Sequence, residues 1–256
     1  MGFVSLLYGV AVYVFFLATF LYAIAFAGNL WVAKTIDSGA AAGVAESLLV
    51  NLGLLAIFAL QHSIMARRSF KRWWTRIVSP AVERSTYVLA ATLALALLLW
   101  QWRPIPEPVI WSVESAAGTL VLRSVFWLGW TVLLVSTFLI NHFELFGLRQ
   151  VFARLAGHEL PEAEFRTPFF YRYVRHPLYV GWLLTFWSAP VMTVAHLFFA
   201  AMTTAYILMA IRFEEADLMS AYGDTYRRYR TQVPMIIPAL RNPQEEAVSK
   251  EIAVAN

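Results

Sequence analysis

Cysteine is missing from this sequence and charge is scarce in it. The 256 residues contain no cysteine, which excludes disulfides, thiolate zinc sites and a cysteine nucleophile. Charged residues make up only 14% of the chain and hydrophobic residues 60%, a balance typical of a polytopic membrane protein. The formal net charge of +4 comes from short basic segments without a continuous basic face, so no nucleic-acid partner is expected. The composition predicts one membrane domain that is surrounded by lipid.

Two common ligand-binding signatures are absent as well. The five histidines show no HxH or HxxxH spacing, so no metal site is expected. None of the twelve glycines forms a GxG, so the glycine-rich turn of a Rossmann sheet is not expected. No basic segment precedes the first apolar run, which predicts a first membrane helix rather than a signal peptide.

Charge-free windows mark the expected membrane helices, because a crossing needs about 20 apolar residues. The windows are residues 1–33, 47–66, 85–102, 124–143 and the stretch between Arg175 and Arg212. The last window is too long for one crossing, and Pro190 divides it, so it is expected to form a helical hairpin. The prediction is an all-α bundle of six apolar helices followed by short C-terminal helices. The last two apolar helices are expected to be short, and the sequence leaves open whether each crosses the bilayer fully.

The distribution of Lys and Arg predicts the orientation. One side of the expected bundle holds most of the basic residues in its connections: Arg67, Arg68, Lys71, Arg72, Arg76, Arg84, Arg149, Arg154, Arg166, Arg172 and Arg175. The other side holds Lys34, Arg103 and Arg123. Both termini are therefore expected in the cytoplasm, with one domain over residues 1–241 and a polar tail over 242–256.

Polar side chains inside the expected spans need a partner or a function. Two helices carry them at helical spacing: Asn51 and His62 in the second, and Thr137, Asn141 and Glu144 in the fourth, with His142 beside them. These two stripes could face one cavity. Hydrogen bonding between helices is the alternative and is favoured for Asn51. His62, His142 and Glu144 are the ionisable candidates for chemistry.

The string RHPLYVGW predicts a second polar group at the start of a helix. Pro177 suits the first helical position, which places Arg175 and His176 at the helix mouth, where backbone N–H groups favour a carboxylate. Tyr179 lies one turn further on and could meet an aromatic base or a sulfonium.

The string EEADLMSAYGDTYRRYRTQVP follows the last apolar helix. Acidic residues at a helix C-terminus oppose the helix dipole, so another group is expected to favour Glu214 and Glu215. Gly223 predicts a helix end, and Tyr222 begins a run of tyrosines at helical spacing. A cationic or zwitterionic ligand would suit these two strings together.

The paired strings RHPLYVGW and EEADL…YGDTYRRYRTQVP resemble the C-terminal module of the isoprenylcysteine carboxyl methyltransferase family, over about residues 166–238. The resemblance implies that S-adenosylmethionine is held at the cytosolic face between this module and the helix bundle. It also implies the cofactor contacts, which are His176, Tyr179, Glu215, Glu214 and Tyr222.

Three further strings, FALQHSIMAR, STFLINHFELFGLRQVF and FRTPFFYRYVRHPLYVGW, are similar to the branch of bacterial methanethiol S-methyltransferases. This similarity implies an inner-membrane enzyme that methylates a small thiol, methanethiol to dimethyl sulfide, by in-line transfer. His142, His62 or Glu144 would accept the thiol proton, and Arg175 would stabilise the thiolate or hold the cofactor. The alternatives are a prenylcysteine or lipid-like acceptor, a small transporter, and a nicotinamide-dependent reductase. No oligomeric state is predicted.

Overall fold

The structure is a computed structural model and consists mainly of helices. It describes residues 2–40, 42–161 and 164–238. The expected polar tail from residue 242 lies outside the described residues. The α-helices are α1 (Gly2–Ala27), α2 (Val44–Ala66), α3 (Arg68–Trp74), α4 (Pro80–Gln101), α5 (Ala116–Ile140), α6 (His142–Leu145), α7 (Leu148–Ala156), α8 (Pro177–Trp187), α9 (Val194–Tyr222) and α10 (Asp224–Gln232). A 3₁₀ turn, η1 (Phe169–Arg172), and two strands, β1 (Val109–Ser112) and β2 (Val191–Thr193), complete the described elements.

Five helices, α1, α2, α4, α5 and α9, are long and apolar enough to cross a membrane. They confirm the multi-pass fold that the charge-free windows predict. The expectation of two short final helices is wrong for α9, which has 29 residues, whereas α8 has only 11. Because α9 continues to Tyr222, the acidic pair at 214–215 lies inside a helix and does not follow one.

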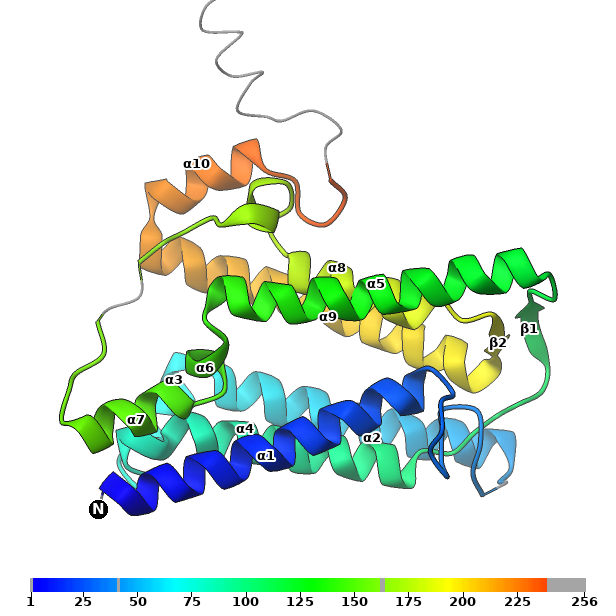
Figure 1. The fold of residues 1–256 in the computed structure, drawn as a ribbon, viewed down its shortest axis with the longest axis horizontal. Helices are drawn as coiled ribbons and strands as arrows, with labels where there is room; N and C mark the ends of the chain where they lie inside the picture. The colour runs from blue at the N-terminus through cyan, green and yellow to red at the C-terminus, as the bar shows by residue number, and fades with distance from the viewer. Residues whose placement is uncertain (1, 41, 162–163, 239–256) are drawn as a thin grey trace, which may run out of the picture.

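The chain runs back and forth between two ends of the molecule (Figure 1). At one end, here called the α3–α10 end, lie α3, α6, α7, α10 and the start of α1. At the opposite end, the β1–β2 end, the antiparallel pair β1–β2 links the segment before α5 to the turn between α8 and α9. This small sheet was not expected. The strand β2 continues the crossing that the short α8 begins, and α9 then runs back. Helix α10 therefore lies at the same end as the start of α1.

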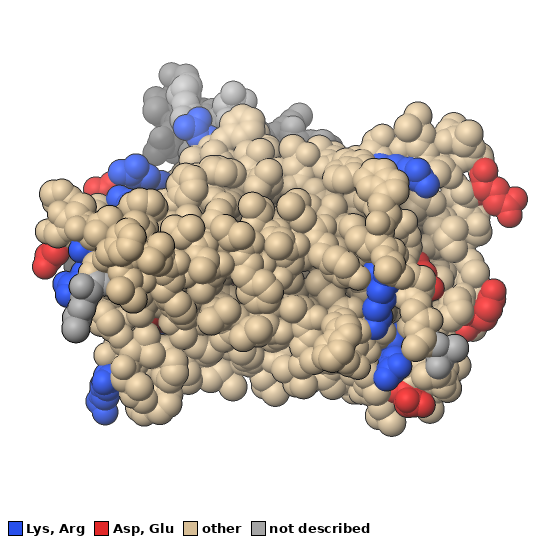
Figure 2. Space-filling view, turned by 60° about the horizontal axis from the view of Figure 1, so that its bottom comes forward, with Lys and Arg blue, Asp and Glu red and all other residues tan. Residues whose placement is uncertain are grey.

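The molecular surface agrees with a membrane position. On the face drawn in Figure 2, charged side chains gather toward the two ends and a broad uncharged band lies between them. Large apolar side chains are exposed along the long helices, among them Phe3, Leu21, Leu49, Leu120 and Phe138. A band of this kind is stable in hydrocarbon and costly in water.

The main hydrophobic core lies toward the β1–β2 end, where α2, α4, α8 and α9 meet. Trp102 is fully buried in it, packs edge-on against Phe26 and Phe199, and donates its indole N–H to the carbonyl of Ile36. Asn51 is also fully buried and exchanges two hydrogen bonds with the backbone of Arg103. Asn51 therefore has the structural role that its position in a span favours.

A polar contact joins the loops at the β1–β2 end. The carboxylate of Asp37 accepts hydrogen bonds from Thr193 and Asn29 and lies 3.6 Å from Nδ1 of the buried His196. Burial alone would raise the pKa of Asp37, but the hydrogen bonds from His196, Thr193 and Asn29 outweigh it and hold this pKa below its ordinary value. His196 therefore ties the start of α9 to the loop between α1 and α2.

Helices α5 and α8 are in near backbone contact, which fixes the depth of the start of α8. A Cβ on Gly181 would lie 2.7 Å from the carbonyl oxygen of Gly129, so neither position has room for a side chain. Beyond this contact α5 continues for eleven residues to Ile140, whereas α8 has only four residues between its start and Gly181. At 1.5 Å per residue, the start of α8 is recessed by about 10 Å from the end of α5.

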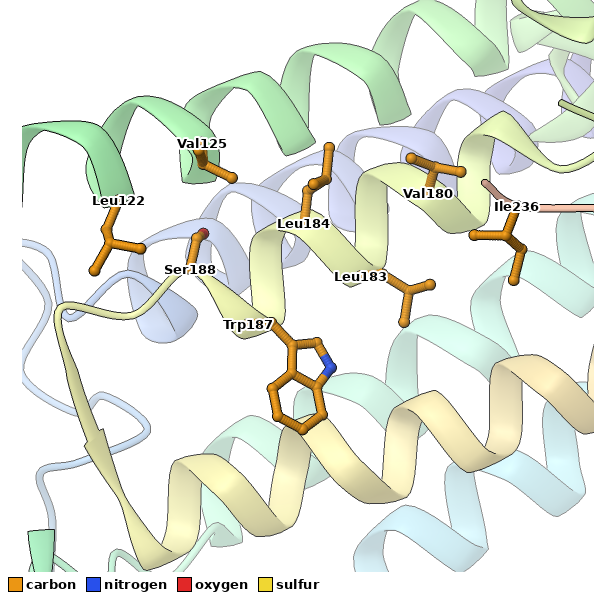
Figure 3. Close-up of a pocket in the computed structure, with 8 residues that line it drawn as sticks. All are labelled: Leu122, Val125, Val180, Leu183, Leu184, Trp187, Ser188 and Ile236. Atoms are coloured by element: carbon orange, nitrogen blue, oxygen red, sulfur yellow. The ribbon is translucent and has the colours of Figure 1, made fainter. Parts of the chain in front are cut away.

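An apolar groove of about 340 Å³ follows α8 on its membrane-facing side (Figure 3). It is lined by Leu122, Val125, Val180, Leu183, Leu184, Trp187, Ser188 and Ile236. No ionisable side chain lines this groove, so it suits hydrocarbon and not the chemistry of a charged ligand. The charged groups that the sequence singles out lie at the start of α8.

Candidate active site

The recessed start of α8 carries Arg175 and His176, as the sequence predicts. Pro177 is the first residue of the helix, and His176 is its N-cap in a non-helical conformation. The backbone N–H groups of Arg175 and His176 donate to the carbonyls of Pro234 and Met235, at 2.9 and 3.2 Å. The segment that follows α10 therefore crosses directly over the mouth of α8.

Glu215 of α9 is the centre of the charged cluster. Its side chain is only 9% exposed, and its Oε1 lies 2.8 Å from Nε of Arg175 and 3.2 Å from Nε2 of His176. Its Oε2 lies 3.2 Å from Nε of Arg230, on α10. A buried carboxylate is costly unless it is paired, and these three donors supply the pairing.

Arg175 connects three parts of the chain. Besides Glu215, its Nη1 donates to the carbonyl of Arg230 at 3.0 Å and to that of Val233 at 2.5 Å. A planar guanidinium suits such a set of acceptors because its five donors point in fixed directions. The side chain thus fastens the end of α10 to α8 and α9.

Glu214 and Tyr179 extend the cluster toward the interior of the bundle. Oε2 of Glu214 lies 3.7 Å from Nδ1 of His176, and its side chain is 46% exposed. The ring centroid of Tyr179 lies 5.7 Å from that of His176. The structure thus brings together five predicted site residues, which are Arg175, His176, Tyr179, Glu214 and Glu215.

Tyr222 lies with a different group of side chains. Its ring packs 5.2 Å from Phe165, which also contacts Tyr226 and Tyr229 of α10. Phe165 precedes η1, so this aromatic group joins the α7–α8 connection to α10.

Tyr226 is a site residue that the sequence analysis did not single out. The residue is 1% exposed, and its hydroxyl has no hydrogen-bond partner among the described residues. Burial, and then the negative charge of Glu215, raise its pKa to about 12, so it is a neutral donor at pH 7. A buried hydroxyl without a partner costs free energy unless a ligand supplies one. Its spacing from Tyr222 and Tyr229 was the only signal in the sequence.

His62 belongs to a second polar group, between α2, α4 and α9. The hydroxyl of Tyr87 lies 3.0 Å from each ring nitrogen of His62, whose ring stacks on Phe58. Ser63, the next residue of α2, is 3.0 Å from the hydroxyl of Tyr206 on α9. Tyr206 lies on α9 about two turns before Glu214, so this group adjoins the cluster around Glu215 along that helix.

His142 has partners for both ring nitrogens. Nδ1 lies 2.8 Å from Oγ1 of Thr137, and Nε2 lies 2.8 Å from the hydroxyl of Tyr13. The hydroxyl of Thr137 donates its single proton to the carbonyl of Leu134. Nδ1 of His142 therefore donates to Thr137, and Nε2 accepts from Tyr13. The ring also stacks on Phe138 at 4.3 Å. These contacts describe a satisfied interhelical histidine.

The expected polar stripe of the fourth span is interrupted. Helix α5 ends at Ile140, and the side chain of Asn141 caps α6 by accepting from the backbone N–H of Glu144. This local cap competes with continuation of the helix. The carboxylate of Glu144 turns to Arg149 at 2.7 Å and to Asn141 at 2.8 Å. It is not part of the Glu215 cluster in the described residues, so the expectation of one continuous stripe is wrong.

Comparisons with known proteins identify the family of the chain. Residues 128–220 match the family described as "Isoprenylcysteine carboxyl methyltransferase (ICMT) family". A methanethiol S-methyltransferase of Crocosphaera subtropica is 55% identical over 91% of each chain, and one of Mycobacterium tuberculosis is 52% identical over 92% of this chain and 96% of its own. Nurim of Sus scrofa is 31% identical over 78% of this chain and 77% of its own. No solved structure matches. The chain therefore belongs to the isoprenylcysteine carboxyl methyltransferase family and, within it, groups with the methanethiol S-methyltransferases.

Proposed function

We propose that this protein transfers the methyl group of S-adenosylmethionine to methanethiol and releases dimethyl sulfide. The observation that carries the proposal is the meeting of His176, Tyr179, Glu214 and Glu215 from two helices at one recessed site. The relatives named methanethiol S-methyltransferase, at 52–55% identity over more than nine-tenths of the chain, support the choice of acceptor.

The donor set fits a zwitterionic, positively charged cofactor. Glu214 offers a carboxylate that is only half-buried, and Tyr226 offers a buried hydroxyl without a protein partner among the described residues. Such groups would receive an ammonium group and a hydrogen-bond acceptor, respectively. When bound, S-adenosylmethionine supplies an electrophilic methyl group on a sulfonium. Tyr222, on the neighbouring aromatic group, would support an aromatic base.

The protein would contribute mainly position and exclusion of water. The recess of about 10 Å places the cluster below the end of α5. The segment after α10, fastened by Arg175, closes the site from above. Enclosure of this kind holds donor and acceptor in line and strengthens the attraction between opposite charges. Arg175 therefore acts by closing the site, rather than by contact with the thiolate.

A base must take the thiol proton, because the thiolate is the nucleophile. His62, His142 and Glu144 are the candidates. Ser63, the residue after His62, contacts Tyr206 on the helix that carries Glu214. His142, in contrast, uses both ring nitrogens within the bundle, and Glu144 is paired with Arg149. These contacts favour His62 as the base.

The proposed location is a bacterial cytoplasmic membrane with the α3–α10 end in the cytoplasm. That end carries most of the arginines and lysines of the connections, which favours a cytoplasmic position. The same orientation places both termini in the cytoplasm and gives the site access to the cytosolic cofactor pool. Tagging each terminus and testing its accessibility to protease in sealed spheroplasts checks this orientation.

The experiment is a headspace assay on the purified protein in detergent. Methanethiol and S-adenosylmethionine together are expected to yield dimethyl sulfide, and omission of either one is expected to abolish it. A prenylcysteine analogue tests the alternative acceptor in the same assay. Absence of dimethyl sulfide together with methylation of the prenylcysteine would refute the proposed acceptor. Absence of cofactor binding in calorimetry would refute the enzyme class.

A further inference from the structure

We infer that Arg84, with Tyr87 and His62, forms the acceptor subsite that binds and ionises a small thiol. The inference rests on the proposed function and assigns its acceptor end. Arg84 lies on the second turn of α4, close to the α3–α10 end, and its Cζ is 5.0 Å from the centroid of the Tyr87 ring. The sequence alone gives Arg84 only as one basic residue in a connection.

The position of Arg84 is fixed on one side and open on the other. Its Nε donates to the carbonyl of Leu145 at 2.7 Å, which orients the planar guanidinium. In the described part of the chain, no protein acceptor is found for its terminal amino groups. Neighbouring acids do not neutralise it, since Glu83 of the same helix turns away to Lys71 at 3.2 Å. Arg84 thus keeps a positive charge and free donors beside His62.

A row of polar side chains connects the proposed cofactor site to the acceptor subsite. It has a carboxylate at one end and a guanidinium at the other. Glu214 lies at one end, with its Oε2 3.7 Å from Nδ1 of His176. About two turns earlier on the same helix, the hydroxyl of Tyr206 lies 3.0 Å from Oγ of Ser63, the residue after His62. At the other end, Cζ of Arg84 lies 5.0 Å from the centroid of the Tyr87 ring, whose hydroxyl lies 3.0 Å from the ring nitrogens of His62. A carboxylate end attracts a sulfonium and a guanidinium end attracts a thiolate. This polarity matches a methyl donor on the α9 side and a thiol acceptor on the α4 side.

Tyr87 restricts how His62 takes part. Its hydroxyl lies 3.0 Å from both ring nitrogens of His62 and 3.5 Å from the His62 carbonyl, yet a phenol donates only one proton. When the Tyr87 hydroxyl donates that proton to the His62 carbonyl and accepts from one ring N–H, the other ring nitrogen is unprotonated and can take the thiol proton. The charged and titratable groups near it are Arg84, Tyr87 and Glu83 from α4 and, from α9, Tyr206, which contacts the adjacent Ser63.

The step balances with the proposed reactants alone. The S–H bond of the thiol breaks and its proton passes to the free ring nitrogen of His62. The sulfur electron pair forms the new C–S bond with the methyl carbon, and the electrons of the broken sulfonium C–S bond stay on the leaving sulfide. Arg84 holds the sulfur while it carries negative charge. The class of acceptor is a small, unbranched thiol or hydrogen sulfide.

The test is Arg84→Gln in the full-length protein, with Arg84→Lys as a second variant and the exposed Arg76→Gln as the control. Because the variant loses a charge-assisted hydrogen bond, we expect its kcat/KM for methanethiol at pH 7 to be about 10- to 100-fold lower. The rising limb of the pH–rate profile should move to higher pH, because the bound thiol loses the cation that favours its ionisation. Affinity for S-adenosylmethionine should stay within about twofold. Arg84→Lys should be intermediate because it keeps the charge without the fork.

Three results would overturn the inference while leaving the proposed function intact. The first is an Arg84→Gln variant with wild-type KM and pH profile. The second is a variant in which cofactor affinity falls as much as thiol turnover, which would indicate a structural role through Leu145. The third is an equal loss in Arg76→Gln. Failure of the wild-type protein itself to methylate methanethiol would refute the proposed function and this inference together.

A more acidic acceptor gives an independent readout of the base. Methaneselenol is far more acidic than methanethiol, so it needs no protein base at pH 7. His62→Gln should therefore lose turnover with methanethiol and regain most of it with methaneselenol. An equal loss with both acceptors would exclude His62 as the base and remove it from this subsite.

Discussion

Replacement of Glu215 by Gln tests the centre of the cluster with little change in shape. The carboxylate oxygens are contacted by Arg175, His176 and Arg230, at 2.8, 3.2 and 3.2 Å. An amide keeps one acceptor oxygen but loses the negative charge, and it turns an NH₂ group toward one of the donors. The variant therefore removes the ionic part of the contacts that hold α8, α9 and α10 together.

The expected magnitude follows from these contacts. A hydrogen bond to a charged group contributes about 1.5–3 kcal/mol and a neutral one about 0.5–1.5 kcal/mol, so the buried side of Glu215 loses about 1–1.5 kcal/mol. The Arg230 side chain is 53% exposed, so its pairing adds less than about 1 kcal/mol. A total of about 2 kcal/mol corresponds to roughly a 30-fold weaker cofactor affinity.

The assay is titration calorimetry of S-adenosylmethionine against the detergent-solubilised variant. The matched control is Glu164→Gln, which removes a carboxylate 2.7 Å from Arg166 where both side chains are more than 70% exposed. That control should bind the cofactor like the wild type. If Glu215→Gln binds as tightly as Glu164→Gln, the closed arrangement around Glu215 does not hold the cofactor and the reasoning fails.

Three further substitutions test other parts of the structure. His176→Ala should weaken cofactor affinity at least tenfold in calorimetry, because it removes the N-cap side chain beside two carboxylates; an unchanged Kd contradicts its assignment. His142→Ala should slow thiol turnover less than tenfold and leave cofactor affinity unchanged, since its contacts lie within the bundle; a loss of 100-fold or more, typical of a general base, would restore it as the base. Gly181→Ala should lower the melting temperature by several degrees, because the new Cβ would lie 2.7 Å from the carbonyl oxygen of Gly129. The control Gly53→Ala should not lower it, because open space surrounds Gly53. Equal melting temperatures for the two variants would refute the tight α5–α8 contact.

Local sequence signals located most of the helices. Charge-free windows of about 20 residues identify the spans because unpaired charge is expensive in hydrocarbon. Pro177 marks the start of α8 and Gly223 the end of α9, since both residues act through the backbone itself. These features depend on neighbours in the chain, and the sequence therefore contains them in full.

Other features depend on partners that are distant in the sequence. Glu215 is a buried carboxylate within α9, and only Arg175, forty residues earlier, and the adjacent His176 explain how it is paired there. The segment after the short α8 is held by the pairing of β2 with β1, and β1 begins more than eighty residues before β2. No local pattern contains either contact.

The sequence by itself determined that this protein is a multi-pass helical membrane protein, because hydrophobicity, charge and helix ends are properties of short segments. The family motifs also identified the residues of the cluster around Glu215. Only the tertiary structure decided that His62 and Arg84 lie beside Tyr87, that His142 is fully paired, and that Tyr226 leaves a hydroxyl without a protein partner among the described residues. Those distinctions arise from the packing of separate helices, and the free energy of a polar group inside a bundle depends on which helix faces it.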